Sequence, residues 1–116
     1  INNHTWNLDD IRVKSIYADK DKRLNPLGKS PDDVWCIPNL VGKKSEKVPH
    51  PTQKPLELCD RIIKCSTNEN DIILIPFAGS GSEFVSAVNL NRKSIGIEKE
   101  KQYYDVAVRR ASEYCH

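Results

Sequence analysis

The chain has 116 residues, of which 38% are hydrophobic, which is enough for one small domain with a single core. Its net charge of +2 is too small to indicate a nucleic-acid partner by itself; the excess lies in residues 1–49, with nine Lys and Arg against seven Asp and Glu. No apolar stretch approaches the roughly 18 residues of a membrane helix and the N-terminus lacks a signal-peptide pattern, so no membrane partner is expected.

The four cysteines lack the paired spacing and the histidine partners of a zinc site. We therefore expect free thiols in a reducing cytosol and no metal. The cysteines are Cys36, Cys59, Cys65 and Cys115.

Residues 1–22 predict a strand or an extended arm with one buried face, because apolar side chains lean towards alternation there. These side chains are Trp6, Leu8, Ile11, Val13 and Ile16. Arg12 and Lys14 would lie on the opposite face, where they could meet phosphates or be solvated.

Residues 22–33 are punctuated by Pro, Gly and Asn and predict a loop. In the short apolar stretch that follows, Trp35 is expected to be a core or interface residue, and base stacking is the weaker alternative. Residues 39–48, which we call the lysine loop, are polar and hold three clustered lysines. These are Lys43, Lys44 and Lys47. Binding to a phosphate backbone and simple solvation both fit such a segment.

A hexapeptide, His50-Pro51-Thr52-Gln53-Lys54-Pro55, precedes a predicted helix in which Leu56, Cys59 and Ile63 recur on one face. Pro55 suits the first helical position, so by itself the hexapeptide predicts a rigid entry to that helix.

Residues 72–75 are aliphatic without polar alternation, which indicates a strand buried on both faces of a parallel sheet. They run into residues 76–82, Pro-Phe-Ala-Gly-Ser-Gly-Ser, where two glycines let the backbone turn tightly and approach a ligand. Ser82 is then expected to cap a helix that ends near residues 89–91.

A second parallel strand is predicted at residues 94–97, with Glu98 at its carboxyl end. The arrangement outlines a nucleotide site, because the turn amides favour an anionic group while Glu98 can accept hydrogen bonds from both ribose hydroxyls. Phe84 stands where a dinucleotide fingerprint has its third glycine, and the Gly-Lys pair of a triphosphate loop is absent. The pattern favours an adenosyl group that carries a carboxylate; the alternative is a glycine turn that only joins a strand to a helix.

A final helix is predicted at residues 101–113, with a structural role. Its apolar stripe is Tyr104, Ala107, Val108 and Ala111. Arg109 and Arg110 near its end would complement the helix dipole. Only two parallel strands are found, whereas an open doubly wound sheet needs several more, and the chain begins with Ile-Asn-Asn-His rather than methionine. We therefore expect part of a larger protein, or one half of a split one.

Three motifs in this order and spacing resemble those of the β-group DNA amino-methyltransferases of bacterial restriction–modification systems, which use S-adenosylmethionine. They are the hexapeptide, the glycine-rich turn at residues 76–82, and Gly96-Ile97-Glu98. Residues 25–38 also resemble the stretch before the histidine-proline motif in adenine-specific members, and the resemblance spans most of residues 8–113.

The resemblance implies an α/β chain with a Rossmann-like three-layer αβα methyltransferase fold that is only partly contained in these residues. Residues 1–49 would be part of the target-recognition or connecting region, and residues 50–116 the S-adenosylmethionine-binding part.

The resemblance also assigns residues to the cofactor. Phe77 would lie against the adenosyl moiety, the turn around Gly79 and Gly81 would hold the methionine part, and Glu98 would hold the ribose hydroxyls. The hexapeptide would bring polar groups to the methionine carboxylate. The full implied set is Thr52, Gln53, Lys54, Phe77, Ala78, Gly79, Ser80, Gly81, Ser82 and Glu98.

The sequence departs from the family pattern in three places. Ile75 stands where the family usually has an acid, which removes a polar contact to the amino-acid end of the cofactor, and Ser82 replaces the commoner threonine but keeps the hydroxyl. The family's catalytic motif, an acidic or amide residue followed by Pro-Pro and an aromatic residue, is missing, because no Pro-Pro dipeptide occurs. No catalytic residue is assigned, and we expect this chain alone to bind cofactor at best and not to methylate.

The resemblance thus implies a cytoplasmic bacterial DNA methyltransferase that transfers a methyl group to a flipped base, with the N6 amine of adenine as the expected target. N4-cytosine methylation is the close alternative, and a non-catalytic split or degenerate subunit that binds DNA or protein is another. A nucleotide-binding oxidoreductase is disfavoured by Phe84. Expected partners are double-stranded DNA, the missing amino-terminal catalytic segment and, as a compatible option, a second copy. The DNA contacts would come from Arg12, Lys14, Lys43, Lys44 and Lys47.

Overall fold

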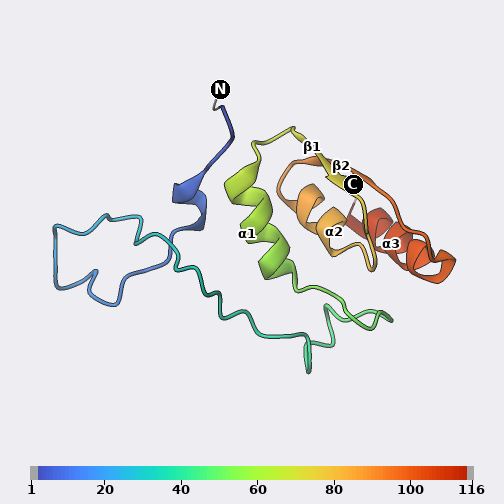
Figure 1. Ribbon diagram of the computed structural model, residues 1–116. Helices are drawn as coiled ribbons and strands as arrows, with labels where there is room; N and C mark the ends of the chain where they lie inside the picture. The colour runs from blue at the N-terminus through green and yellow to red at the C-terminus, as the bar shows by residue number, and fades with distance from the viewer. Residues whose placement is uncertain (1–2, 115–116) are drawn as a thin grey trace.

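The computed structural model describes residues 3–114, and its regular elements gather after residue 55 (Figure 1). In chain order the elements are η1 (Leu8–Ile11), α1 (Leu56–Ser66), β1 (Ile72–Ile75), α2 (Ser82–Asn89), β2 (Lys93–Gly96) and α3 (Lys101–Tyr114). Between η1 and α1 the chain runs as a long open trace. The Cα radius of gyration is 16.4 Å, above the roughly 13 Å of a compact chain of this length. The second half therefore holds most of the core.

The predicted strand, turn, helix and strand are confirmed as a parallel β1–α2–β2 unit. Register runs from Ile72 opposite Lys93 to Ile75 opposite Gly96. Beyond the strands, the Ile97 amide donates to the Ile75 carbonyl at 2.9 Å, which continues the ladder towards the turn. This pairing sets the carboxyl ends of both strands beside the glycine-rich segment.

The prediction that β1 is buried on both faces is wrong for the described residues. Ile75 is buried, but Ile72 and Leu74 are 66% and 63% exposed. Gly96, which pairs with Ile75 and shares its face, lies against Phe84 of α2. The helices therefore cover only the face of the sheet that carries Ile75, and the alternate side chains point away from them.

Helix α2 lies at the centre of the helical layer, between α1 and α3. Its Val85, Ser86 and Ala87 are completely buried, and the two small side chains allow close helix packing. Helix α1 begins at Leu56 and Pro55 takes the capping place before it, one residue earlier than predicted. The final helix is confirmed.

The amino-terminal segment forms a short 3-10 helix instead of the predicted strand or extended arm, followed by a single bridge between Val13 and Lys29. Asn7 explains the difference, because its side-chain amide donates to the carbonyl of Thr67 at 2.8 Å while its backbone amide donates to that of Cys65. These contacts at the end of α1 capture the segment locally. Of the apolar residues that suggested alternation, Trp6 and Ile16 are exposed and Ile11 is buried.

Three cysteines are free thiols as expected, and Cys115 lies outside the described residues. Burial raises the pKa of the Cys59 thiol to about 12, aided by the nearby carboxylates of Glu83 and Asp60. Within residues 3–114, no helix is long and apolar enough to cross a bilayer.

Candidate functional site

The glycine-rich turn joins β1 to α2 through two residues in the left-handed region, Gly79 with φ 51° and Gly81 with φ 75°. Its exit is tied down, since the Gly81 amide donates to the Ala78 carbonyl at 2.8 Å. Ser82 does not cap α2 as predicted. It is the first helical residue, and Gly81 occupies the capping position with no side-chain hydrogen bond.

Glu98 lies just beyond β2 and reaches back to the turn. Its carboxylate accepts hydrogen bonds from the Glu100 amide at 2.8 Å and the Gly79 amide at 2.7 Å. These bonds, the one from Glu100 first, hold the pKa of Glu98 below its ordinary value. The side chain is therefore an anion at neutral pH, and each oxygen keeps a lone pair for a further donor such as a hydroxyl.

Two hollows open beside the turn. One, of about 290 Å³, is lined by Glu98, Phe84 and Tyr104. The other, of about 380 Å³, is lined by Phe77 and Lys54 among others. Phe77 is 90% exposed, so it is free to meet a planar ligand. Phe77 and Glu98, both assigned to the adenosyl group by the resemblance, thus line different hollows on either side of the turn.

His50, which the sequence reasoning did not assign to the site, lies directly on the turn. A Cβ atom added at Gly79 would be only 3.1 Å from its Nε2, so no side chain fits there without moving the histidine. The ring packs edge-on against Tyr103, with centroids 4.4 Å apart, and its Nδ1 accepts from the Thr52 amide at 3.2 Å. Its position as the first residue of the hexapeptide was the signal that could have identified it.

The hexapeptide residues divide between the turn and the preceding loop. The Lys54 carbonyl accepts a hydrogen bond from the Ser82 hydroxyl at 2.8 Å, which brings the hexapeptide to the turn, and the exposed Lys54 side chain borders the larger hollow. Gln53 points the other way: its Oε1 accepts from Val48 and its Nε2 donates to the Glu46 carbonyl, each at 2.8 Å. Thr52 is exposed. The structure therefore brings Lys54, but not the Gln53 side chain, to the turn.

The basic residues assigned to DNA differ in how free they are. Arg12 has a side chain only 17% exposed, with its Nε bonded to Asp9 at 2.6 Å and its Nη1 to the Gly28 carbonyl at 3.2 Å. Lys14 and the lysine loop side chains are exposed. The lysines are thus available to a phosphate backbone, whereas Arg12 already serves the local fold.

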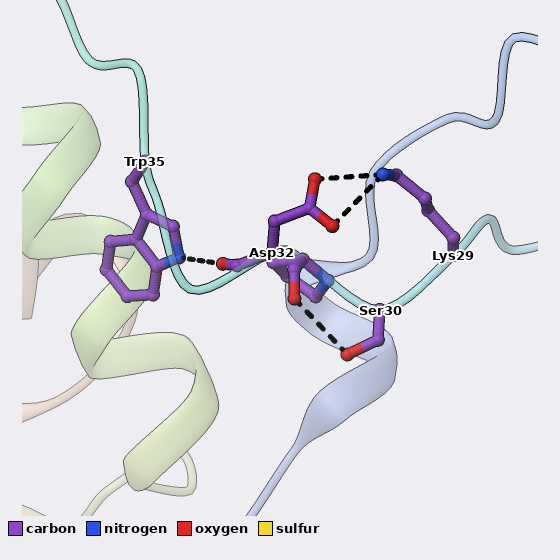
Figure 2. A network of polar contacts seen from close by, with 5 residues as sticks. Lys29, Ser30, Asp32 and Trp35 are labelled. Atoms are coloured by element: carbon purple, nitrogen blue, oxygen red, sulfur yellow. Dashed lines mark hydrogen bonds and ion pairs between the residues drawn. The ribbon is translucent and has the colours of Figure 1, made fainter.

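Trp35 anchors its loop to the helical layer, in line with the interface role expected for it. Figure 2 shows its indole nitrogen donating to the Asp32 carbonyl, at 2.8 Å, and Lys29 paired with the carboxylate of Asp32, at 2.9 Å. The guanidinium carbon of Arg61 in α1 lies 4.9 Å from the centroid of the Trp35 ring system. One face of the indole is therefore occupied by Arg61 and is closed to a base.

Comparison with known proteins gives a consistent result. The family model described as DNA methylase matches residues 2–109. Type II methyltransferase M.BglII of Bacillus subtilis is 44% identical over 109 residues, covering 86% of this chain and 30% of that protein. DNA adenine methyltransferase YhdJ of Escherichia coli K12 is 38% identical over 123 residues, covering 98% and 42%. The chain thus spans between about a third and two fifths of the length of these relatives.

Among solved structures, the complex of M1.HpyAVI with S-adenosylmethionine matches with a TM-score of 0.55 and 52% identity, over 56% of this chain and 32% of that one. The matching structures have the Rossmann-like methyltransferase fold, of which the β1–α2–β2 unit is a part. A family match over residues 2–109, on top of a glycine turn closed by a strand-end carboxylate, leads to one conclusion: this chain belongs to the DNA methylase family.

Proposed function

We propose that this chain supplies the S-adenosylmethionine-binding part of a site-specific DNA methyltransferase that methylates the N6 amine of adenine. The observation that carries the proposal is the ionised Glu98, held 2.7 Å from the amide of Gly79 at the end of β2. That carboxylate is placed to accept from ribose hydroxyls. The similarity to a structure solved with S-adenosylmethionine, and to a relative named as an adenine methyltransferase, supports the choice of ligand and base.

The residues of the turn fit such a ligand. Gly79 leaves the backbone open where any side chain would meet His50, and the exposed amino terminus of α2 favours an anionic group. Bound S-adenosylmethionine supplies an electrophilic methyl group. The residues of the turn and Glu98 bind and orient it, and the groups that draw on the amine hydrogens of a flipped base come from outside these 116 residues.

Double-stranded DNA is the proposed substrate, with Lys14 and the lysine loop contacting its phosphates. We infer a location in the bacterial cytoplasm, because that is where such a substrate is found. A second copy of the protein is compatible with this function but is not required by it.

The proposal is tested by calorimetric titration of the full-length protein with S-adenosylmethionine, beside a Glu98→Gln variant. Loss of the anionic acceptor is expected to weaken binding by about 1 to 3 kcal/mol. Glu100→Gln is the matched control, because only the backbone of Glu100 contacts Glu98. Absence of wild-type binding, or preferential binding of NAD, would refute the cofactor assignment. Digestion of methylated DNA then separates N6-methyladenine from N4-methylcytosine.

A further inference from the structure

We propose that Arg110 of α3 is a positioning residue that fixes the glycine-rich turn and tunes it for the amino-acid end of the ligand. This inference rests on the proposed function and extends it to a residue outside the family motifs. It replaces the sequence-based interpretation, in which Arg110 complements the dipole of its own helix and α3 is purely structural.

The guanidinium of Arg110 points inward to the turn. The residue is only 6% exposed, and its Nη1 donates to the Ser80 carbonyl at 2.9 Å, to the Ser82 hydroxyl at 3.2 Å and, more weakly, to the Ser80 hydroxyl at 3.4 Å. Ser80 and Ser82 are themselves almost fully buried. One nitrogen therefore holds both serines that flank Gly81 in their present orientation.

Helix α3 makes a second contact one turn earlier. A Cβ atom added at Gly81 would lie 3.0 Å from both the Cα and the Cβ of Ala107, so the backbone of the turn packs directly on the helix. Arg110 follows Ala107 by three residues and projects from the same side of α3. Two adjacent points on one rigid helix thus set the position of the turn.

The charge of Arg110 has no counter-ion within the helical layer. In residues 3–114 no carboxylate lies within ion-pair distance of it, and its partners are one carbonyl and two hydroxyl groups. A buried cation held only by neutral oxygens keeps a positive potential behind the turn, on the side from which the amides at the start of α2 also attract anions. The carboxylate of a methionine moiety at the turn would complete that arrangement.

The two ends of the ligand can be tested separately. S-adenosylmethionine carries the amino-acid end, whereas methylthioadenosine has the same adenosine and sulfur but lacks it. If Arg110 acts through the turn on the amino-acid end, its loss weakens binding of the first ligand and spares the second. A merely structural role would weaken both ligands together.

Calorimetry on the full-length protein tests this with Arg110→Met, which removes the charge and the donors but keeps much of the apolar stem. We expect S-adenosylmethionine affinity to fall at least about tenfold, the effect of losing a hydrogen-bonded charge, with methylthioadenosine changed less than about threefold. Arg110→Lys restores a cationic donor and is expected to recover most of the loss. Arg109→Met is the matched control, because Arg109 is the exposed neighbour on the same helix.

Should Arg110→Met not fold, Arg110→Gln keeps an amide donor without the charge and is expected to show the same ligand selectivity. Equal loss for both ligands, or an unchanged affinity for S-adenosylmethionine in folded variants, would overturn the inference while leaving the proposed function intact. A wild-type protein that binds methylthioadenosine but not S-adenosylmethionine would overturn both.

Discussion

Replacing Gly96 by alanine tests how tightly β2 packs on α2. A Cβ atom at Gly96 would lie 2.1 Å from Cζ of Phe84 and within 3.0 Å of both adjacent ring carbons, whereas carbon atoms in normal contact are about 3.5 to 4.0 Å apart. The ring must therefore move by roughly 1.5 Å. It has little room to do so, because on its other side it lies 3.4 Å from the Cβ position of Gly81. Overpacking of this kind costs about 1 to 3 kcal/mol.

The measurement is the free energy of unfolding of the full-length protein in urea, for Gly96→Ala, Phe84→Leu and the double variant. Because leucine removes the outer ring carbons, the double variant is expected to be less destabilised than the sum of the single variants by about 1 to 2 kcal/mol. Gly42→Ala is the control: its Cβ would meet no atom within 4 Å, so any cost there comes from its φ of +87° and does not couple to Phe84. Additive costs for Gly96 and Phe84 would refute the packing argument.

Three further predictions concern the acid, the lysine loop and the thiols. Because folding favours ionised Glu98, the stability it contributes is complete above about pH 4.5 and is lost as the pH falls through its lowered pKa, so the thermal midpoints of wild type and Glu98→Gln should converge near about pH 3. Alanine at all three lysines of the lysine loop should reduce the salt slope of DNA binding by about one unit for each phosphate that is no longer bound, whereas alanine at Lys101, which pairs with an aspartate on α3, should not; an unchanged slope would leave the loop merely solvated. In mass-spectrometric mapping, iodoacetamide should modify exposed Cys36 well before Cys59, whose burial and raised pKa suppress the thiolate, and equal rates would contradict the burial of Cys59.

The strand, turn, helix and strand could be predicted because their signals are local. An aliphatic run, two glycines and an acid at the end of the next strand define the unit without distant partners. The role of Phe84 needed the structure. Its ring occupies the space over Gly96, so here the strand supplies the glycine and the helix the bulky residue, the reverse of the dinucleotide fingerprint, in which a helix glycine allows close packing.

Two errors arose where side-chain contacts override pattern. The apparent alternation before residue 17 gave way to η1, because Asn7 bonds to carbonyls at the end of α1. On α3 the predicted apolar stripe is only partly buried, since Tyr104 and Val108 are about half exposed while Arg110 lies inside. Arg110 falls on the same side of the helix as buried Ala107, and a cation at such a position is the signal that sequence analysis could have used.

The open face of the sheet connects the one clear failure of the strand prediction to the extent of the chain. An aliphatic run without alternation indicates burial on both faces, yet in these residues helices cover only one, and Ile72, Leu74 and Ile95 remain exposed. The sequence pattern reflects the environment of a complete sheet, and this chain spans well under half the length of its relatives. The face that is covered is the one that supports the turn, Glu98 and Arg110. The geometry of the candidate cofactor site is thus fixed by contacts within residues 50–110, while the opposite face of the sheet is left for other packing.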